Sequence, residues 1–177
     1  MSIIRSIDIH THIIPEKLPR WTEKFGYGDF IHLEHHVNCK ARMMVGDKFF
    51  REIDHNCWNA KQRIKECDHD HVAVQVLSTI PVLFNYWAQP KDGLETSKFL
   101  NDHIANTVNL FPERFIGLGT LPMQSPSLAV KELERCIKEL GFAGVQIGSN
   151  VNKKNLSDPS FHEVWAAAQK LNAAIFI

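Results

Sequence analysis

The chain has 177 residues, of which 44% are hydrophobic and 23% are charged. Its 20 Lys and Arg balance its 20 Asp and Glu, so it lacks the basic surplus of nucleic-acid-binding proteins. No apolar run approaches the roughly 20 residues of a membrane span, and the polar residues soon after the first isoleucines exclude a secretory signal. We therefore predict one globular domain over residues 1–177, with neither a nucleic acid nor a membrane as partner.

The cysteines do not form a disulfide or metal motif. Cys39, Cys57, Cys67 and Cys136 are scattered, without a Cys-x-x-Cys pair. In a chain of this size without a signal, free thiols in a reducing compartment are favoured over disulfides. We therefore expect the protein in the cytosol.

Short apolar runs alternate with amphipathic stretches along the chain. The runs predict strands at Ile3–Ile9, Val72–Leu77, Phe115–Leu118, Val145–Ile147 and Ala174–Ile177. The amphipathic stretches predict helices at Asn59–Asp68, Leu94–Leu110, Ser127–Leu140 and Pro159–Leu171. Strands and helices in strict alternation indicate a parallel α/β sheet with right-handed crossovers.

The fold class that remains is a (β/α)8 TIM barrel. No Gly-x-Gly-x-x-Gly motif follows a predicted strand, so a dinucleotide-binding fold loses its main support. A full barrel takes about 250 residues, and this chain reaches only its fifth predicted strand. We predict a partial barrel of about the first four and a half βα units, the front half of a longer protein.

The first strand-to-helix connection is far longer than the usual few residues. Within residues 18–58, the segments Ala41–Val45 and Lys48–Ile53 flank Gly46-Asp47, a dipeptide suited to a tight hairpin turn. An insertion after the first strand would lie over the end of a barrel where catalysis occurs. We predict that residues 18–58 form a small β lid.

Two His-x-His patterns are candidates for a metal site. His10 and His12 end the first predicted strand, where alternate side chains share a face and their Cα atoms lie about 7 Å apart. That end is the catalytic face of a barrel, and two imidazoles can converge there on one metal ion. His69 and His71 lie between a helix end and the next strand, at the opposite face. The alternative for His10 and His12 is a hydrogen-bonded pair without a metal.

Other polar residues receive structural interpretations. Asp8 shares the predicted face of His10, and it is either a buried hydrogen-bond partner or a group that orients the metal ligands. The residues His35, His36, His69, His71 and His103 are interpreted as surface or helix-terminal histidines.

The segment Asp8-Ile-His-Thr-His-Ile-Ile-Pro15 resembles the first-strand signature of the amidohydrolase superfamily. More narrowly, the chain is similar over nearly its whole length to zinc-dependent decarboxylases of the kynurenine branch of tryptophan catabolism. Longer blocks carry this narrower resemblance: Phe25–Gly28, His35-His36, Asn56–Trp58, Leu77–Pro81, Tyr86-Trp87, Phe115–Gln124 and Glu139–Gly148.

The resemblance implies a metal-dependent carboxy-lyase acting on a small dicarboxylate. It implies that His10 and His12 are zinc ligands, and that Arg51 binds a substrate carboxylate, for which a guanidinium offers a planar bidentate match. Lys48 and Trp87 are further candidates for substrate binding, although solvation of Lys48 and apolar packing of Trp87 explain them as well. Imidazole ligands also suit other divalent transition metals.

The resemblance places the remaining catalytic groups outside these 177 residues. A third ligating His would directly follow the fifth strand, and a catalytic His and a ligating Asp would come later. A second carboxylate-binding Arg would come from a neighbouring subunit, which implies a homodimer in the full-length form. We predict no acid–base residue within this chain. Two alternatives remain open: a catalytically inactive half-barrel or interaction fragment, or another metal-dependent hydrolase or decarboxylase of the superfamily.

Overall fold

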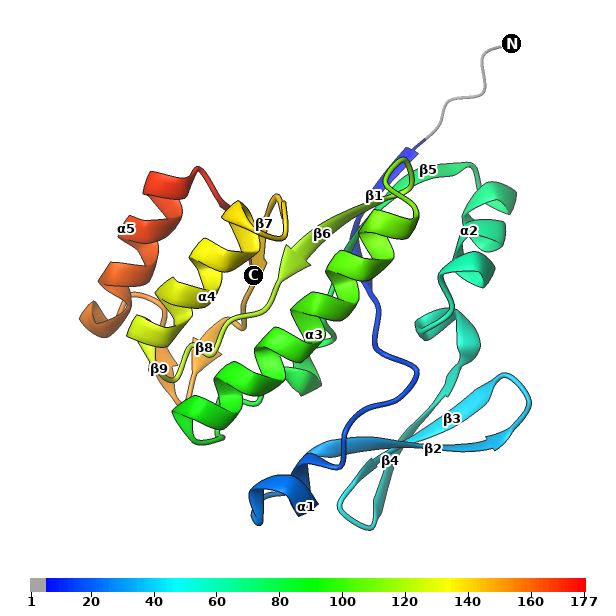
Figure 1. The fold of residues 1–177 in the computed structure, drawn as a ribbon, viewed down its shortest axis with the longest axis horizontal. Helices are drawn as coiled ribbons and strands as arrows, with labels where there is room; N and C mark the ends of the chain where they lie inside the picture. The colour runs from blue at the N-terminus through cyan, green and yellow to red at the C-terminus, as the bar shows by residue number, and fades with distance from the viewer. Residues whose placement is uncertain (1–5) are drawn as a thin grey trace.

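A parallel five-stranded sheet organises the chain in the computed structural model, which describes residues 6–177 (Figure 1). Its strands are β1 (Ser6–His12), β5 (Val72–Ser78), β6 (Phe115–Gly119), β7 (Gly144–Gln146) and β10 (Ala174–Phe176). They lie in the order β1-β5-β6-β7-β10, so each strand pairs with the next parallel strand along the chain. The five predicted strands are confirmed, and residues 3–5 of the first lie outside the described residues.

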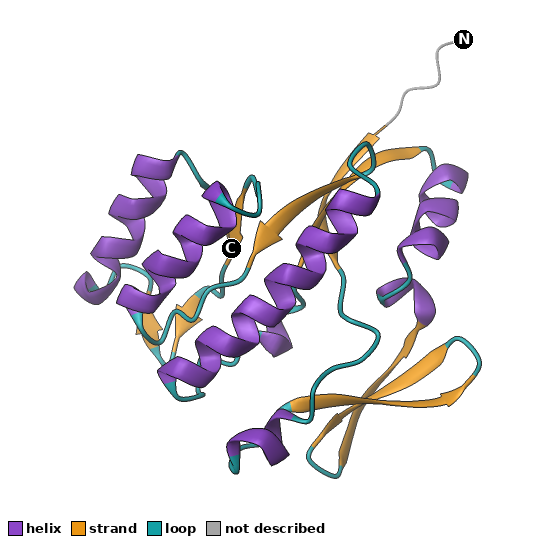
Figure 2. Cartoon of the chain, in the orientation of Figure 1, coloured by secondary structure: helices purple, strands orange, loops and turns teal. Residues whose placement is uncertain are grey.

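Helices connect successive strands and cover the sheet. They are α2 (Ala60–His69), α3 (Pro90–Leu110), α4 (Pro126–Lys138) and α5 (His162–Leu171). In Figure 2, α3, α4 and α5 lie next to one another on one side of the sheet, and α4 contacts both of its neighbours. The predicted fourth helix begins with a separate 3-10 turn, η3 (Pro159–Phe161), where the Asp158 side chain accepts a bond from the Ser160 amide.

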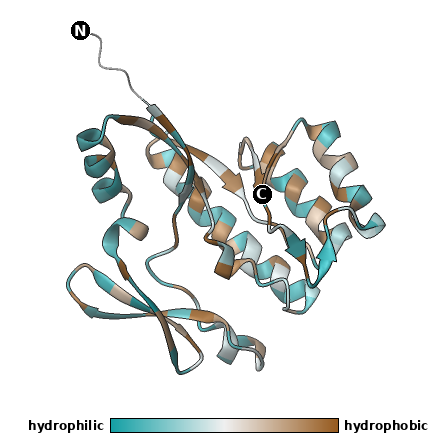
Figure 3. Ribbon diagram, turned by 180° about the vertical axis from the view of Figure 1, so that it is seen from behind, coloured by the Kyte–Doolittle hydropathy of each residue, from teal (hydrophilic) through white to brown (hydrophobic). Residues whose placement is uncertain are grey.

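The core lies between these helices and the sheet. Apolar residues run along the strands, as the hydropathy colours of Figure 3 show. Leu77, Phe115 and Val145 contribute from the strands, and Leu133 from α4, each with at most 2% of its surface exposed. Helices cover one face of the sheet, whereas the strand residues Ile7, Ile9 and Ile116 are 61%, 62% and 40% exposed.

The sheet is curled rather than flat. The strands β1 and β10 are its two outermost members, yet the ring of His10 on β1 lies 4.9 Å from that of Phe176 on β10. A helix-covered parallel sheet that curls in this way is a half-barrel. The predicted partial barrel is therefore confirmed.

Residues between β1 and α2 form a second, antiparallel sheet. It contains β2 (Ile31–Val37), β3 (Lys40–Val45) and β4 (Lys48–Asp54), preceded by α1 (Trp21–Phe25) and followed by the 3-10 turn η1 (His55–Cys57). The predicted hairpin is β3–β4, with Gly46 at φ 57° in its turn. The sequence interpretation missed α1 and β2.

The antiparallel sheet lies at the carboxyl edge of the parallel sheet. Its buried residues Ala41, Met43 and Ile53 pack in one cluster with Ile14, which follows β1, and Leu83, which follows β5. Strand ends at this edge carry the active sites of barrel enzymes. The insert therefore has the position that a lid would need.

Short elements complete the chain. They are the 3-10 turn η2 (Pro81–Leu83) and the small hairpin of β8 (Asn150–Val151) with β9 (Lys154–Asn155). Among residues 6–177, none of the helices combines the length and the hydrophobicity that crossing a membrane requires.

Candidate metal centre

The two histidines of the first strand converge at the carboxyl edge of the sheet. The rings of His10 and His12 lie 5.1 Å apart, edge to face, at the end of β1. His10 is exposed, whereas His12 is partly buried. The predicted convergence of the two imidazoles is thus present in the structure.

An irregularity in β1 includes His10 and directly precedes Thr11 and His12. The strand advances three residues, from Asp8 to Thr11, while β5 advances two, from Gln75 to Leu77. Such a bulge interrupts the alternation of side chains and re-aims those that follow. The Asp8 carboxylate accepts a bond from the main-chain amide of His10 at 3.2 Å. Asp8 is half-buried, and its carboxylate bonds the main chain of His10. It therefore stabilises the backbone of β1 and does not orient the His10 ring.

Ser78, at the end of β5, contacts the ring of His12. Its hydroxyl oxygen lies 3.0 Å from Nδ1 of His12 and 2.9 Å from the carbonyl oxygen of Thr11, to which the hydroxyl donates. Ser78 is 2% exposed. Sequence reasoning missed this residue, although its position at the end of the neighbouring strand was a usable signal.

Arg63 on α2 supports the same strand end from the other side. Its guanidinium donates from Nη2 to the carbonyl oxygens of His12, at 2.6 Å, and of Asn56, at 3.0 Å. Its Nη1 donates to Oε1 of Gln75 at 3.2 Å, and the Gln75 amide donates to Asp8 at 3.3 Å. This network connects β1, which carries His10 and His12, to the turn η1 at the end of the insert. Sequence reasoning missed Arg63 as well.

The surroundings of His12 favour its neutral form. Burial lowers the pKa of His12, and the nearby His10 and the Arg63 cation lower it further. Because a metal binds only the neutral imidazole, these surroundings also reduce competition from protons. The electrostatics of the site are therefore compatible with metal binding.

The donor set at this edge is incomplete within the described residues. Across residues 6–177, no group of three or more His, Cys, Asp or Glu side chains is placed to hold a metal ion. Two imidazoles nonetheless have the chemistry that Zn²⁺ and similar ions prefer. His10 and His12 thus fit a divalent metal as part of its ligand set, and catalytic zinc sites have three protein ligands.

The two predicted cationic residues share one face of the insert. In the pairing of β3 with β4, Met43 faces Arg51 while Met44 faces Phe49, so Phe50 is an extra residue in β4. Val45 faces Lys48. Because paired residues share a face and alternate along β3, this bulge brings Lys48 and Arg51 to the same side. A regular strand would place them on opposite sides.

Arg51 is available for a ligand. It is exposed, its guanidinium lies 5.7 Å from the centre of the Phe50 ring, and it forms none of the salt bridges among residues 6–177. Lys48 is also exposed. The geometry leaves the two cations free to bind a carboxylate but does not bring them into contact with described acidic groups.

Trp87 lines a cleft of about 470 Å³ between the loops that follow β5 and β7. Its ring packs 4.5 Å from that of Phe30 in the insert, and 49% of the residue is exposed. The neighbouring Tyr86 joins the two loops, because its hydroxyl accepts a bond from the Gly148 amide at 3.0 Å. Trp87 therefore combines packing against the insert with a surface open to a ligand.

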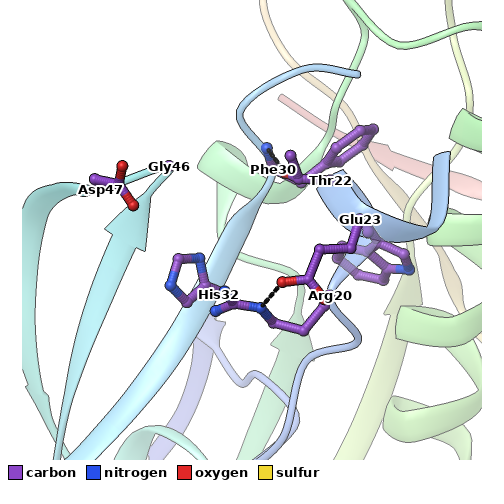
Figure 4. A pocket seen from close by; sticks show the side chains of 8 residues that line it. Arg20, Thr22, Glu23, Phe30, His32, Gly46 and Asp47 are labelled. Atoms are coloured by element: carbon purple, nitrogen blue, oxygen red, sulfur yellow. Dashed lines mark hydrogen bonds and ion pairs between the residues drawn. The ribbon is translucent and has the colours of Figure 1, made fainter. Parts of the chain in front are cut away.

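A smaller hollow, of about 120 Å³, lies within the insert (Figure 4). Arg20 and Glu23 form an ion pair of 2.9 Å at its wall, next to the side chain of His32. None of the predicted site residues lines it. This hollow is therefore separate from the candidate metal centre.

Most of the other histidines lie where the sequence predicts. His69 and His71 are exposed, between the end of α2 and the start of β5, at the edge opposite His10. His35 and His36 are exposed on β2, and the ring of His35 bonds the Glu16 carbonyl oxygen at 2.7 Å. The interpretation of His103 as a surface histidine is wrong.

His103 points inward from the middle of α3. Its Nε2 is buried without a hydrogen-bond partner among the described residues, and its ring contacts the main chain of Ile14. Burial lowers the pKa of His103. The error arose because only the packing of α3 against the segment after β1 decides which of its polar residues are covered.

Comparisons with known proteins agree with this geometry. The chain is 56% identical over 171 residues to the 2-amino-3-carboxymuconate-6-semialdehyde decarboxylase of Dictyostelium discoideum, covering 97% of this chain and 48% of that relative. The protein of the same name from Caenorhabditis elegans is 35% identical, over 91% of this chain and 45% of the relative. The chain spans about half the length of the curated relatives it matches.

A solved structure shows the same fold. The 5-carboxyvanillate decarboxylase of Novosphingobium aromaticivorans, determined with manganese and 4-hydroxy-3-methoxy-5-nitrobenzoic acid, matches with a TM-score of 0.75 at 18% identity. The match covers 98% of this chain and 49% of that structure. The amidohydrolase family model matches residues 7–177, which confirms the family predicted from the first-strand motif. Because that match includes nearly every residue, the chain belongs to the amidohydrolase family.

Proposed function

We propose that this chain forms the N-terminal half of a decarboxylase that acts on 2-amino-3-carboxymuconate 6-semialdehyde, in the kynurenine branch of tryptophan catabolism. The observation that carries the proposal is the 56% identity, across 97% of the chain, to a relative with that name. His10 and His12, whose rings lie 5.1 Å apart at the carboxyl edge, would supply two of the ligands that a metal needs for this chemistry.

The proposed metal is zinc, bound in part by His10 and His12. When bound, a divalent ion would supply a Lewis acid that polarises water or a substrate oxygen. The remaining ligands would come from residues that follow β10, because Phe176 at the end of that strand lies against His10. The 5-carboxyvanillate decarboxylase structure contains manganese, so manganese is the natural competitor to test.

The proposed substrate contacts come from the insert and from the loop after β5. Arg51 would bind one carboxylate through a bidentate pair, and Lys48 on the same face would add a second positive charge. Trp87, which packs against Phe30 of the insert, would line the cleft between the loops that follow β5 and β7. In this proposal residues 18–58 form the lid, and its closure would exclude water from the reacting carboxylate.

The proposed assembly and location are supported by the family resemblance and by the cysteines. We expect the whole protein to be a homodimer in the cytosol. The predicted free thiols are present, because Cys39, Cys57, Cys67 and Cys136 are all unpaired in the structure. The oligomeric state is measured directly by sedimentation of the whole protein.

The test uses the whole protein that contains this chain, expressed from the complete reading frame and loaded with zinc or manganese. Carbon dioxide release from the muconate semialdehyde is measured for the wild type and for Arg51→Ala. Loss of a charged hydrogen bond of about 1.5–3 kcal/mol predicts a fall in kcat/KM of about 10- to 100-fold, mainly through KM.

Arg42→Ala is the matched control. Arg42 is exposed on β3 between the buried Ala41 and Met43, so it points to the other face of the same sheet. We expect its kcat/KM to stay within about threefold of wild type, because surface substitutions there have small effects. A metal-loaded protein that released carbon dioxide only from aromatic acids would keep the family and overturn the substrate.

A further inference from the structure

The hydrogen bonds of Ser78 determine which nitrogen of His12 carries its proton. The Ser78 hydroxyl has a single proton, and the Thr11 carbonyl oxygen, at 2.9 Å, can only accept it. The hydroxyl oxygen must then accept a proton from its other partner, Nδ1 of His12 at 3.0 Å. A neutral imidazole has only one N–H, so Nε2 is left with a free lone pair.

We propose that Ser78 is a positioning residue that holds His12 as the Nδ1–H tautomer and thereby presents Nε2 to the metal. Ser78 is 2% exposed, so water does not compete for its hydroxyl. The Thr11 carbonyl belongs to the residue before His12, so one hydroxyl fixes both the strand and the ring. A hydrogen-bond partner of the nitrogen that does not bind the metal orients a ligating histidine and raises its basicity.

This inference rests on the proposed metal site and specifies that Nε2 is the nitrogen of His12 that would bind the metal. In a free histidine side chain the proton prefers Nε2, which would block the nitrogen that the inference assigns to the metal. Without the Ser78 hydroxyl, metal binding would have to move that proton first. The Ser78 hydroxyl therefore removes the free-energy cost of moving the proton from Nε2 to Nδ1 before the metal binds.

The first experiment measures the tautomer directly in the whole protein that contains this chain, prepared without metal. Long-range ¹⁵N–¹H spectra of the imidazoles, at a pH where His12 is neutral, distinguish a protonated Nδ1 from a protonated Nε2. His12→Gln identifies the His12 signals by their loss. We expect a protonated Nδ1 in the wild type, and a protonated Nε2 in that sample overturns the inference even if no Ser78 variant folds.

The second experiment compares zinc affinity by competition with a chelator. We expect Ser78→Ala to bind zinc about 10- to 100-fold more weakly, the usual effect of losing a partner of a metal ligand. Ser78→Thr retains the hydroxyl and should recover most of the affinity. Thr79→Val is the matched control, because Thr79 is 1% exposed and its hydroxyl is buried without a partner among the described residues.

The outcomes separate this inference from the proposed function. If Ser78→Ala and Thr79→Val weaken binding equally, the hydroxyl has only a general structural role and the inference fails. If wild-type zinc affinity is unchanged in His10→Ala and His12→Ala, the proposed metal site fails instead. If Ser78→Ala alone weakens binding and shifts the proton to Nε2, both stand.

Discussion

The ring of His10 on β1 lies 4.9 Å from the ring of Phe176 on β10, although these strands are the two outermost members of the sheet. The two residues are 166 positions apart in the sequence. Their contact exists because each strand of a twisted parallel sheet is rotated against its neighbour, so that five strands curl toward a barrel. The end of β10 is thereby brought to the candidate metal centre.

Phe176 should contribute to stability through this contact. Phe176→Ala removes most of a half-buried ring, and we expect the free energy of unfolding to fall by about 1–3 kcal/mol, less than for a fully buried Phe. Urea unfolding followed by circular dichroism measures the change. Ile177→Ala is the control, since Ile177 is 67% exposed and its loss should cost under about 0.5 kcal/mol. Equal losses of unfolding free energy in both variants would show that the contact of Phe176 with His10 does not stabilise the fold.

Arg63 should contribute more to the free energy of unfolding than an exposed arginine on a helix does. Its guanidinium is the only described partner linking the carbonyl oxygens of His12 and Asn56, and Arg63→Gln cannot span both. We expect a loss of roughly 2–4 kcal/mol in unfolding free energy, because buried carbonyl groups lose charged donors.

Hydrogen exchange gives a local measurement of the same effect. The Ile14 amide, which donates to the Cys57 carbonyl oxygen at 3.0 Å, should exchange faster in Arg63→Gln. Lys65→Gln, an exposed change on the same helix, should leave both stability and exchange as in wild type. A stable Arg63→Gln with slow exchange at Ile14 would refute the linking role.

The bulge at Phe50 should be needed for carboxylate binding. Inserting an alanine between Met43 and Met44 gives Phe50 a partner on β3, so the pairing becomes regular and Lys48 and Arg51 fall on opposite faces. KM of the whole protein should then rise about tenfold or more. Phe50→Ala retains the bulge and should change KM by less than about threefold. Thermal unfolding of both variants checks that the insert stays folded. Unchanged kinetics after the insertion would show that Lys48 and Arg51 do not act together.

Acid should destabilise the fold through two partly buried histidines, His12 and His103. Burial lowers the pKa of His12 and of His103 from 6.5, so the unfolded chain binds protons more readily than the folded one. Their contribution is complete above pH 6.5 and is lost as the pH falls through the unfolded and then the folded pKa. The paired carboxylates Glu52 and Glu66 have lowered pKa values, so their contribution is lost only at more acidic pH.

His103→Gln tests this assignment. We expect its unfolding free energy to fall less than that of wild type between pH 7 and pH 5, measured by urea titration at each pH. His69→Gln alters an exposed residue at the end of α2 and should reproduce the wild-type slope. If all three proteins lose stability in parallel, the buried His103 does not contribute.

The periodicity of the sequence predicted the main elements correctly. The apolar runs at Val72–Leu77 and Phe115–Leu118 are parallel strands, and the spacing from Ser127 to Leu140 is an amphipathic helix. These signals are local, because each element must bury an apolar stripe or face whatever its partner is. The Gly46-Asp47 turn was predictable for the same reason.

Other features left no local signal. The turn between β2 and β3 places Cys39, rather than a glycine, at φ 67°, so nothing in the composition marked that hairpin. The bulges in β1 and β4 were equally hidden, since an extra residue is defined only against the strand that pairs with it. Alternation alone would have placed Lys48 and Arg51 on opposite faces.

By itself, the sequence determined the parallel α/β class, the His10 and His12 pair and the family resemblance, because these depend on residue type and short-range spacing. Only the tertiary structure decided that Ser78 and Arg63 contact the His12 segment, that Nε2 of His103 is buried and that Phe176 contacts His10. Each of these contacts joins residues from different elements. Their geometry is set by sheet curvature and helix packing, which no window of neighbouring residues contains.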